Sequence, residues 1–161
     1  MRGTLSFAFV AILAAISTSS AHALCIYKGQ MDAKTTQVQE FADARWVVRV
    51  KVIAADNHGS DQDESWTIYH LDVLTAFKGK PSSRIEMFTY RDSGGFYLDQ
   101  GTKPDIGGEY LLFLDPISGS EKVPLAARSA TEVNYSCGQS REWKAVTSSQ
   151  QQQLVALSRQ K

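Results

Sequence analysis

The chain has 161 residues, of which 43% are hydrophobic, and its 17 Lys and Arg residues balance its 17 Asp and Glu residues. This length suits one domain with its own hydrophobic core, and leaves no room for a second. Neither sign of charge is gathered into a long block, so the composition excludes a surface that follows a phosphate backbone, and we expect no nucleic-acid partner.

The first 23 residues have the features of a secretory signal peptide. A short basic start is followed by an apolar run over residues 5–16, and Ala21-His22-Ala23 matches a cleavage signature. The apolar run is too short for a membrane-spanning helix, which needs about 20 residues. We therefore expect a leader over residues 1–23, a single domain over residues 24–161, and a secreted or periplasmic protein without membrane insertion.

Both candidate disulfide residues, Cys25 and Cys137, lie in the predicted mature chain. In an oxidising compartment, two cysteines in a small domain are expected to form a disulfide bond. The alternative is a pair of free buried thiols. A bridge would join the start of the mature chain to the far end of its sheet.

A short helix is predicted within residues 32–44. Thr36 followed three residues later by Gln39 matches a capping box. Val38 and Phe41 are three residues apart, so we expect them to share the face that packs against the rest of the domain.

The next three segments predict a hairpin of two strands. Residues 45–53 alternate between apolar and polar side chains, as a strand with one buried face does. Residues 56–64 are polar, acidic and contain a glycine, which predicts an exposed loop. Residues 65–79 form the longest alternating stretch and predict a central strand whose apolar odd-numbered side chains face the core.

Three further strands are predicted over residues 84–90, 109–114 and 131–137. The middle one is nearly all apolar, which is typical of a strand covered on both faces. Between the first two lies a long Gly-rich segment, residues 92–108. A Gln-rich helix is expected to follow the N-cap candidates at 147–149.

Five strands with a helix near each end predict an all-β-dominated fold, namely a five-stranded OB-like Greek-key barrel with a short N-terminal helix and a C-terminal helix. The C-terminal helix would place Leu154 and Leu157 on one face. The interior of the barrel is expected to be lined by Val48, Val50, Tyr69, Leu71, Val73, Phe77, Leu112 and Tyr135.

The sequence offers no positive evidence for catalysis. Residues 92–95, Asp-Ser-Gly-Gly, are similar to the nucleophile motif of trypsin-like serine proteases, but the flanking Arg91 and Phe96 do not fit that motif. The mature chain has only His58 and His70 as candidate bases. It also lacks the HExxH and CxxC patterns of metal sites. We therefore expect a protein that is not an enzyme, with no catalytic residues, no intrinsic metal site and no cofactor.

Several short pieces occur in a characteristic order between Cys25 and Leu157. They are QEFADA from Gln39, the Val-rich strand with Arg49 and Lys51, the stretch from Tyr69 that closes with Phe77-Lys78-Gly79, GGEYL from Gly107, and WKAVTSSQ after Cys137. Together they resemble the N-terminal inhibitory domain of the tissue inhibitors of metalloproteinases, and more broadly the netrin-type module. The resemblance implies an OB-like barrel that binds another protein. In the most specific form of this interpretation, the partner is a zinc metalloprotease, which the protein inhibits.

The resemblance also implies where a partner would bind. In that family an N-terminal cysteine, pinned by a disulfide, offers its free α-amine and carbonyl to the catalytic zinc of the protease. The pair Cys25 and Cys137 resembles one of the bridges of the family, and the amine of Leu24 or Cys25 would meet the partner's zinc. The implied partner-binding residues, in the N-terminal arm and in the Gly-rich segment, are Leu24, Cys25, Ile26, Tyr27, Ser93, Gly94 and Phe96.

A second interpretation belongs to a different class. OB folds also serve as structural domains of the cell envelope or bind small molecules and glycans on a barrel face. An exposed apolar patch joining Leu24, Ile26, Tyr27 and Phe96 would favour a protein-binding site, whereas charged residues closing over them would indicate an ordinary surface.

Overall fold

The computed structural model describes residues 25–59, 65–117 and 123–160, so the predicted leader and Leu24 lie outside the described residues. Two α-helices and ten strands form in these ranges, together with two short 3₁₀ helices, η1 (Leu125–Ala127) and η2 (Trp143–Ala145). In chain order they are β1 (Ile26–Tyr27), β2 (Gln30–Met31), α1 (Gln37–Asp43), β3 (Trp46–His58), β4 (Trp66–Lys78), β5 (Arg84–Tyr90), β6 (Asp99–Gln100), β7 (Lys103–Pro104), β8 (Glu109–Pro116), β9 (Thr131–Val133), β10 (Arg141–Glu142) and α2 (Ser148–Ser158).

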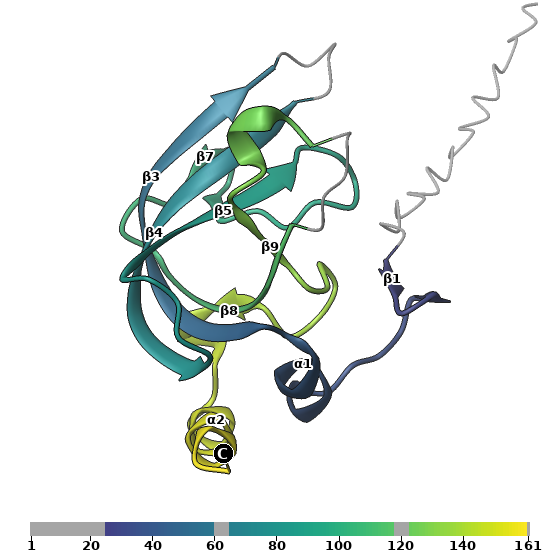
Figure 1. The fold of residues 1–161 in the computed structure, drawn as a ribbon, viewed down its shortest axis with the longest axis vertical. Coiled ribbons are helices and arrows are strands. Elements are labelled where there is room, and N and C mark those ends of the chain that lie inside the picture. The colour runs from purple at the N-terminus through teal and green to yellow at the C-terminus, as the bar shows by residue number, and fades with distance from the viewer. Residues whose placement is uncertain (1–24, 60–64, 118–122, 161) are drawn as a thin grey trace, which may run out of the picture.

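Five of these strands close into a barrel (Figure 1). Strand β3 pairs antiparallel with β4 and β8, and β4 pairs antiparallel with β5. The barrel closes through β9, which pairs with β8 and meets β5 in parallel at Met87 and Thr131. The predicted five-stranded OB-like barrel with two helices is confirmed.

Several element boundaries differ from the prediction. The predicted exposed loop over residues 56–64 is shorter, because β3 continues to His58 and pairs there with Trp66. The predicted last strand, residues 131–137, is ladder-paired only as far as Val133. Beyond it the chain turns, with the amide of Gly138 donating to the Tyr135 carbonyl.

A buried cluster fills the barrel. Its members are Val48, Val50, Val52, Tyr69, Leu71, Met87, Leu98, Tyr110, Leu112 and Leu114. This confirms five of the predicted interior residues, and Val73 packs against the same cluster. Tyr135 is also buried, but it lies under the N-terminal segment, where its hydroxyl donates to the Ala33 carbonyl.

The prediction that Phe77 lines the interior is wrong. Val50 pairs with Val73 while Arg49 pairs with Thr75, so Leu74 is an extra residue in β4. Such a bulge shifts the alternation of side chains that follows it. Phe77 therefore lies on the outer face of the barrel, and the bulged Leu74 is 45% exposed.

A second buried cluster fills the space between the outer face of the barrel and the helices. It contains Phe41, Ala44, Val47, Phe77, Leu111, Phe113, Val146 and Leu154. Strand β8 thus contributes to both clusters, which explains its nearly continuous apolar sequence and confirms the prediction of a strand covered on both faces.

Both helices begin with a capping box, at Thr36 with Gln39 and at Thr147 with Gln150. The prediction for α2 is confirmed, since Leu154 is fully buried. The prediction that Val38 faces the domain is wrong, because Val38 is 45% exposed. The buried residues of α1 are Gln37, Glu40 and Phe41, which follow one another at helical spacing and leave Val38 outside that face.

Cys25 and Cys137 form the predicted disulfide, with their Cα atoms 6.0 Å apart. The bond joins residues that are 112 positions apart in sequence, and so attaches the N-terminal segment to the chain that follows β9. None of the helices in the described ranges is both long enough and apolar enough to cross a lipid bilayer.

Candidate functional site

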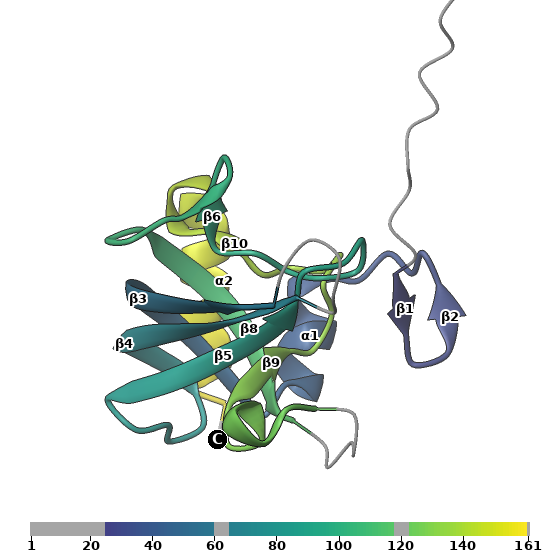
Figure 2. The ribbon, with the colours of Figure 1, turned by 90° about the horizontal axis from the view of Figure 1, so that it is seen from above.

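The predicted N-terminal arm is a small hairpin, residues 26–31, set apart from the barrel beside α1 (Figure 2). Its strands β1 and β2 are joined by Lys28 and Gly29, both with positive φ. Two consecutive residues of this kind are what the tightest hairpin turns require. The local sequence therefore folds this segment back on itself directly after Cys25.

The hairpin has one outer apolar face. Ile26 and Met31 are directly paired, so their side chains project from the same side. They are 57% and 64% exposed. Tyr27 lies on the other side, where its ring centroid is 5.0 Å from that of Tyr135. The inner face thus packs on the domain, and the outer face is presented to solvent.

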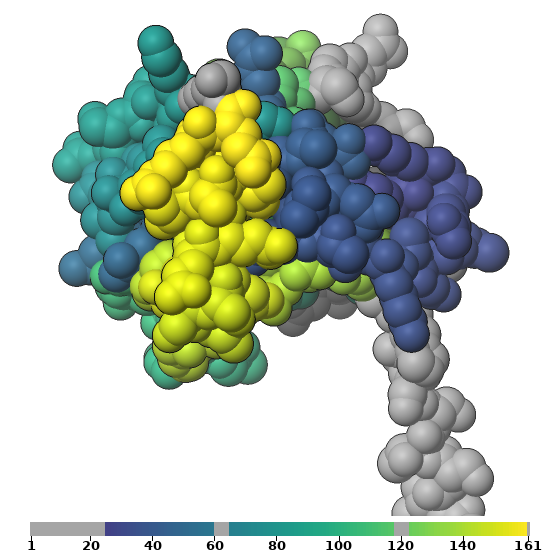
Figure 3. Space-filling model, turned by 90° about the horizontal axis from the view of Figure 1, so that it is seen from below, coloured from purple at the N-terminus to yellow at the C-terminus, as the bar shows by residue number. Residues whose placement is uncertain are grey.

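Charged contacts fasten the hairpin to α1. The Tyr27 hydroxyl donates to the Asp43 carboxylate, and Lys28 Nζ lies 2.6 Å from Asp43 Oδ1. The hydrogen bonds from Lys28 and Tyr27 lower the pKa of the Asp43 carboxyl, so it stays ionised at neutral pH. Figure 3 shows the hairpin at the edge of the molecule, with α1 between it and α2.

A buried glutamate fixes the other end of the disulfide. Glu40 of α1 is fully buried, and both of its carboxylate oxygens accept from the backbone amide of Gln139, at 2.9 and 3.0 Å. Thr35 also donates to it. Burial raises the pKa of the Glu40 carboxyl although these hydrogen bonds oppose the shift. A Cβ at Gly138 would lie 2.2 Å from Glu40 Oε1, so only glycine permits this approach beside Cys137.

The second predicted contact region is the Gly-rich loop, residues 92–98. The Gly94 amide donates to Asp92 Oδ1 at 2.8 Å, and the Tyr97 hydroxyl donates to the Asp92 carbonyl. Gly95 approaches the preceding strand so closely that a Cβ would lie 2.2 Å from the Tyr90 carbonyl oxygen. The loop is therefore compact and held by its own contacts.

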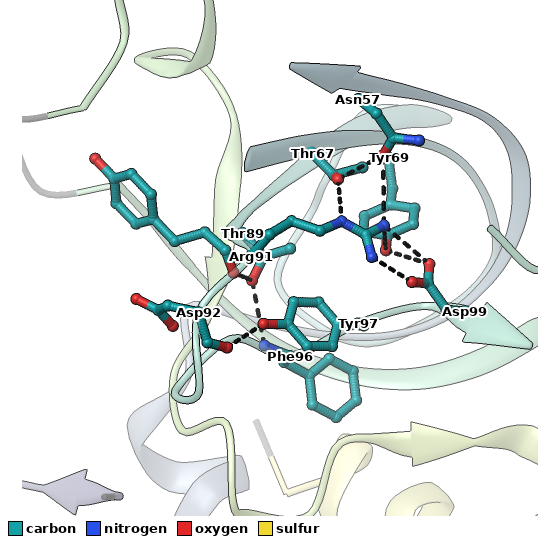
Figure 4. A network of polar contacts seen from close by, with 10 residues as sticks. Asn57, Thr67, Tyr69, Thr89, Arg91, Asp92, Phe96, Tyr97 and Asp99 are labelled. Atoms are coloured by element: carbon teal, nitrogen blue, oxygen red, sulfur yellow. Dashed lines mark hydrogen bonds and ion pairs between the residues drawn. The ribbon is translucent and has the colours of Figure 1, made fainter. Parts of the chain in front are cut away.

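A polar network anchors both ends of this loop to the barrel (Figure 4). Arg91 Nη1 lies 2.6 Å from Asp99 Oδ2, and Arg91 Nε donates to Thr67 Oγ1 at 2.8 Å. Tyr69 donates to Asp99 Oδ1 at 2.6 Å, and burial raises the pKa of its phenol. Asn57 completes the network through Thr67. Because Arg91 and Asp99 flank the loop, their ion pair joins its two ends.

A small cleft lies between the Gly-rich loop and β9, and we name it the β5–β9 cleft. Its volume is about 230 Å³, and it is lined by residues 88–90, 92, 94–96, 132, 133 and 136. Ser136 is the neighbour of Cys137, so the cleft reaches the segment that carries the disulfide. The loop and the N-terminal hairpin thus border the same stretch of chain.

The structure places the predicted partner-binding residues in different environments. Ile26 and Ser93 are exposed, whereas Cys25 is buried by its bridge. Phe96 packs against the interior cluster and Tyr27 against Tyr135, so each ring gives part of its surface to the domain. The apolar pair on the hairpin is instead completed by Met31, which the sequence reasoning missed. The Lys28-Gly29 pair, recognised as a hairpin turn, could have placed Met31 opposite Ile26.

The two histidines considered as bases both have other partners. His58 stacks on Trp66, and His70 lies 2.8 Å from Asp56 and 3.4 Å from Glu86. Within the described ranges, no group of three or more His, Cys, Asp or Glu side chains is arranged to hold a metal ion.

The functional interpretation of the chain depends on the geometry of the hairpin and the barrel. No family model matches the chain, and no curated protein matches it. The resemblance to the metalloproteinase inhibitors therefore stays a prediction, which depends on the sequence pieces and is to be weighed against the barrel and the hairpin described above.

Proposed function

We propose that this protein is a non-enzymatic protein-binding module that contacts its partner through the N-terminal hairpin, and that the partner is a zinc metalloprotease which it inhibits. One observation carries the proposal. A hairpin pinned by the Cys25–Cys137 disulfide holds two large apolar side chains, Ile26 and Met31, away from the domain.

Rigid presentation of apolar side chains favours binding for a physical reason. Ordering a flexible side chain at an interface costs about 0.5–1.5 kcal/mol, and a segment that is already ordered avoids much of this cost. Here the disulfide, the Tyr27 contact with Asp43 and the ring contact with Tyr135 all restrict the hairpin before a partner arrives.

The zinc-directed form of the proposal assigns a role to the mature N-terminus. An α-amine has a pKa near 8, so a useful fraction is neutral at physiological pH and able to donate its lone pair to a metal. If processing leaves Cys25 first, this amine is attached to the residue that the bridge fixes. If Leu24 comes first, the amine moves by up to about 3.5 Å along an extended chain.

The test starts from the authentic exported protein. Its N-terminus is sequenced, and the protein is then titrated against a panel of zinc endopeptidases before and after acetylation of the α-amine. We expect inhibition that acetylation abolishes. A double variant with Ile26→Ser and Met31→Ser should inhibit more weakly, whereas the matched control Val38→Ser, on the exposed side of α1, should not. Failure of the authentic form to inhibit any member of the panel would rule out the zinc-directed form.

A second candidate, a small-ligand or glycan-binding OB domain, has one observation in its favour. A groove of about 620 Å³ is lined by Trp46, Ile85, Lys80, Arg84 and His70, among others. This volume falls in the usual range for small-molecule sites, about 300–1,000 Å³. Titration with a set of oligosaccharides, followed by tryptophan fluorescence, tests it. Binding that Trp46→Ala abolishes would support the candidate, and no binding of any sugar would remove it.

A further inference from the structure

We propose that the β5–β9 cleft receives an arginine side chain of the partner protein. This inference deepens the proposed function, since it rests on a protein partner docking beside the disulfide. Three properties of the cleft point to the same occupant, namely its charge, its walls and its size.

The charge of the cleft is negative. Glu132 and Asp92 line it, and no Lys or Arg is among its lining residues. Within the described part of the chain, the Glu132 carboxylate has no hydrogen bond or ion pair, although the residue is partly buried. Its neighbour across the ladder is another carboxylate, Asp115, which accepts from the backbone amide of Arg45. A half-buried carboxylate without a partner is costly, and a cation from another molecule would compensate it.

The state of Glu132 agrees with this reasoning. Burial, followed by the charge of Asp115, raises the pKa of the Glu132 carboxyl. An incoming cation would favour the ionised form and lower that pKa again. Binding of a positive group is thus linked to relief of an unfavourable charge, which a neutral group cannot provide.

The walls of the cleft favour guanidinium over ammonium. Phe88, Tyr90 and Phe96 are among the lining residues, and beside them stands the Glu132 carboxylate. A planar guanidinium stacks on aromatic faces and forms two parallel hydrogen bonds with a carboxylate, whereas an ammonium is a compact and strongly hydrated charge. A carboxylate with both oxygens free to accept therefore fits arginine better than lysine.

The size of the cleft agrees with one such side chain. At about 30 Å³ for each water in the liquid, a volume of about 230 Å³ corresponds to roughly seven or eight water-sized groups. An arginine side chain has about seven non-hydrogen atoms, each of which takes up less room than a water molecule, so the side chain fits within this volume. The cleft is too small for a folded segment, but it suits a single long side chain that enters from a partner bound at the hairpin.

The test uses small probes, so that it does not depend on the identity of the partner. The probes are N-acetyl-arginine N-methylamide and the corresponding citrulline derivative, which has almost the same shape but no charge. Each is titrated into the ¹⁵N-labelled mature protein and followed by NMR. We expect the arginine probe to shift the amide signals of Gly94, Gly95 and Ser136 with millimolar affinity. The affinity of the citrulline probe should be lower by a factor of at least about ten, which corresponds to about 1.4 kcal/mol in binding free energy.

Two variants complete the design. Glu132→Gln should reduce arginine binding to the citrulline level. The control Asp72→Asn changes a surface carboxylate of β4 that pairs with Arg84 of β5, and it should leave arginine binding unchanged. The same spectra report whether each variant is folded. Equal binding of both probes, shifts that map elsewhere, or arginine binding that survives Glu132→Gln would overturn the inference.

The outcomes also separate this inference from the proposed function. If the protein inhibits a protease but the probes do not bind in the cleft, only the arginine site is wrong. If the arginine probe binds as expected while no protease is inhibited, the cleft remains a site for a cationic side chain, and the partner must belong to another class of protein.

Discussion

Replacing Leu71 with Ala should destabilise the domain strongly, because this residue has no exposed surface and sits in the interior cluster. The substitution removes three buried carbon groups. At about 0.8 kcal/mol for each, the transfer cost alone is about 2.4 kcal/mol. The residual cavity adds to it, so the free energy of unfolding should fall by about 2–5 kcal/mol.

The matched control is Leu74→Ala, which removes the same atoms from the same strand. Leu74 is the bulged residue and is 45% exposed, so we expect a loss of about 0.5–1 kcal/mol. Both variants are unfolded in urea with the disulfide intact. Their urea midpoints are converted to free energies of unfolding with one m-value for both. Equal losses, or a larger loss for Leu74→Ala, would show that β4 does not have the bulge and that its register is different.

Three further predictions concern the segments around the site. Reducing the disulfide should cost about 4–5 kcal/mol, the loop-entropy value for a separation of 112 residues, and an unchanged urea midpoint after reduction would contradict this. Gly95→Ala should lower the melting temperature more than Gly94→Ala. An added Cβ at Gly95 would lie 2.2 Å from the Tyr90 carbonyl oxygen, whereas the atom nearest to an added Cβ at Gly94 would be 3.5 Å away. Equal shifts in melting temperature would contradict this loop geometry. Burial raises the pKa of Glu40 in the folded state above its unfolded pKa of about 4.3, so its contribution to stability is present below the unfolded pKa and is lost as pH rises through the folded pKa. Glu40→Gln should therefore make the free energy of unfolding depend less on pH in that window. A pH profile parallel to that of the unmodified protein would refute this.

The strands could be predicted from sequence because their signal is local. Alternation of apolar and polar side chains fixes which residues can share a face, and it identified all five barrel strands. The position of Phe77 could not be predicted in the same way. Strand β4 must bend to close the barrel, and the bulge that bends it is set by pairing with β3 and not by any residue in β4 alone.

The supports of the site were hidden for a related reason. Glu40 looks like an ordinary helix-surface glutamate in the sequence, and its burial depends on a backbone amide 99 positions away. Arg91 and Asp99 look like loop residues, and they become a network only when the barrel brings Thr67 and Tyr69 beside them. Contacts of this kind depend on the closed topology of the barrel, so they cannot be predicted from local sequence patterns.

The way the hairpin is held supports the proposal that a partner binds its outer face. Hairpins this short are marginal in water by themselves. Among the described residues, this one is held by contacts on its inner face, by the ion pair between Lys28 and Asp43, and by the bond through Cys25. Those contacts do not shelter Ile26 and Met31, whose exposure gives the folded domain no hydrophobic benefit. Burial against a partner would return about 25 cal/mol for each Å² of apolar surface, without the cost of first ordering the segment. A disulfide and a charged pair that hold apolar side chains in solvent are hard to explain by stability alone, and they follow directly if the stable hairpin is the part that another protein binds.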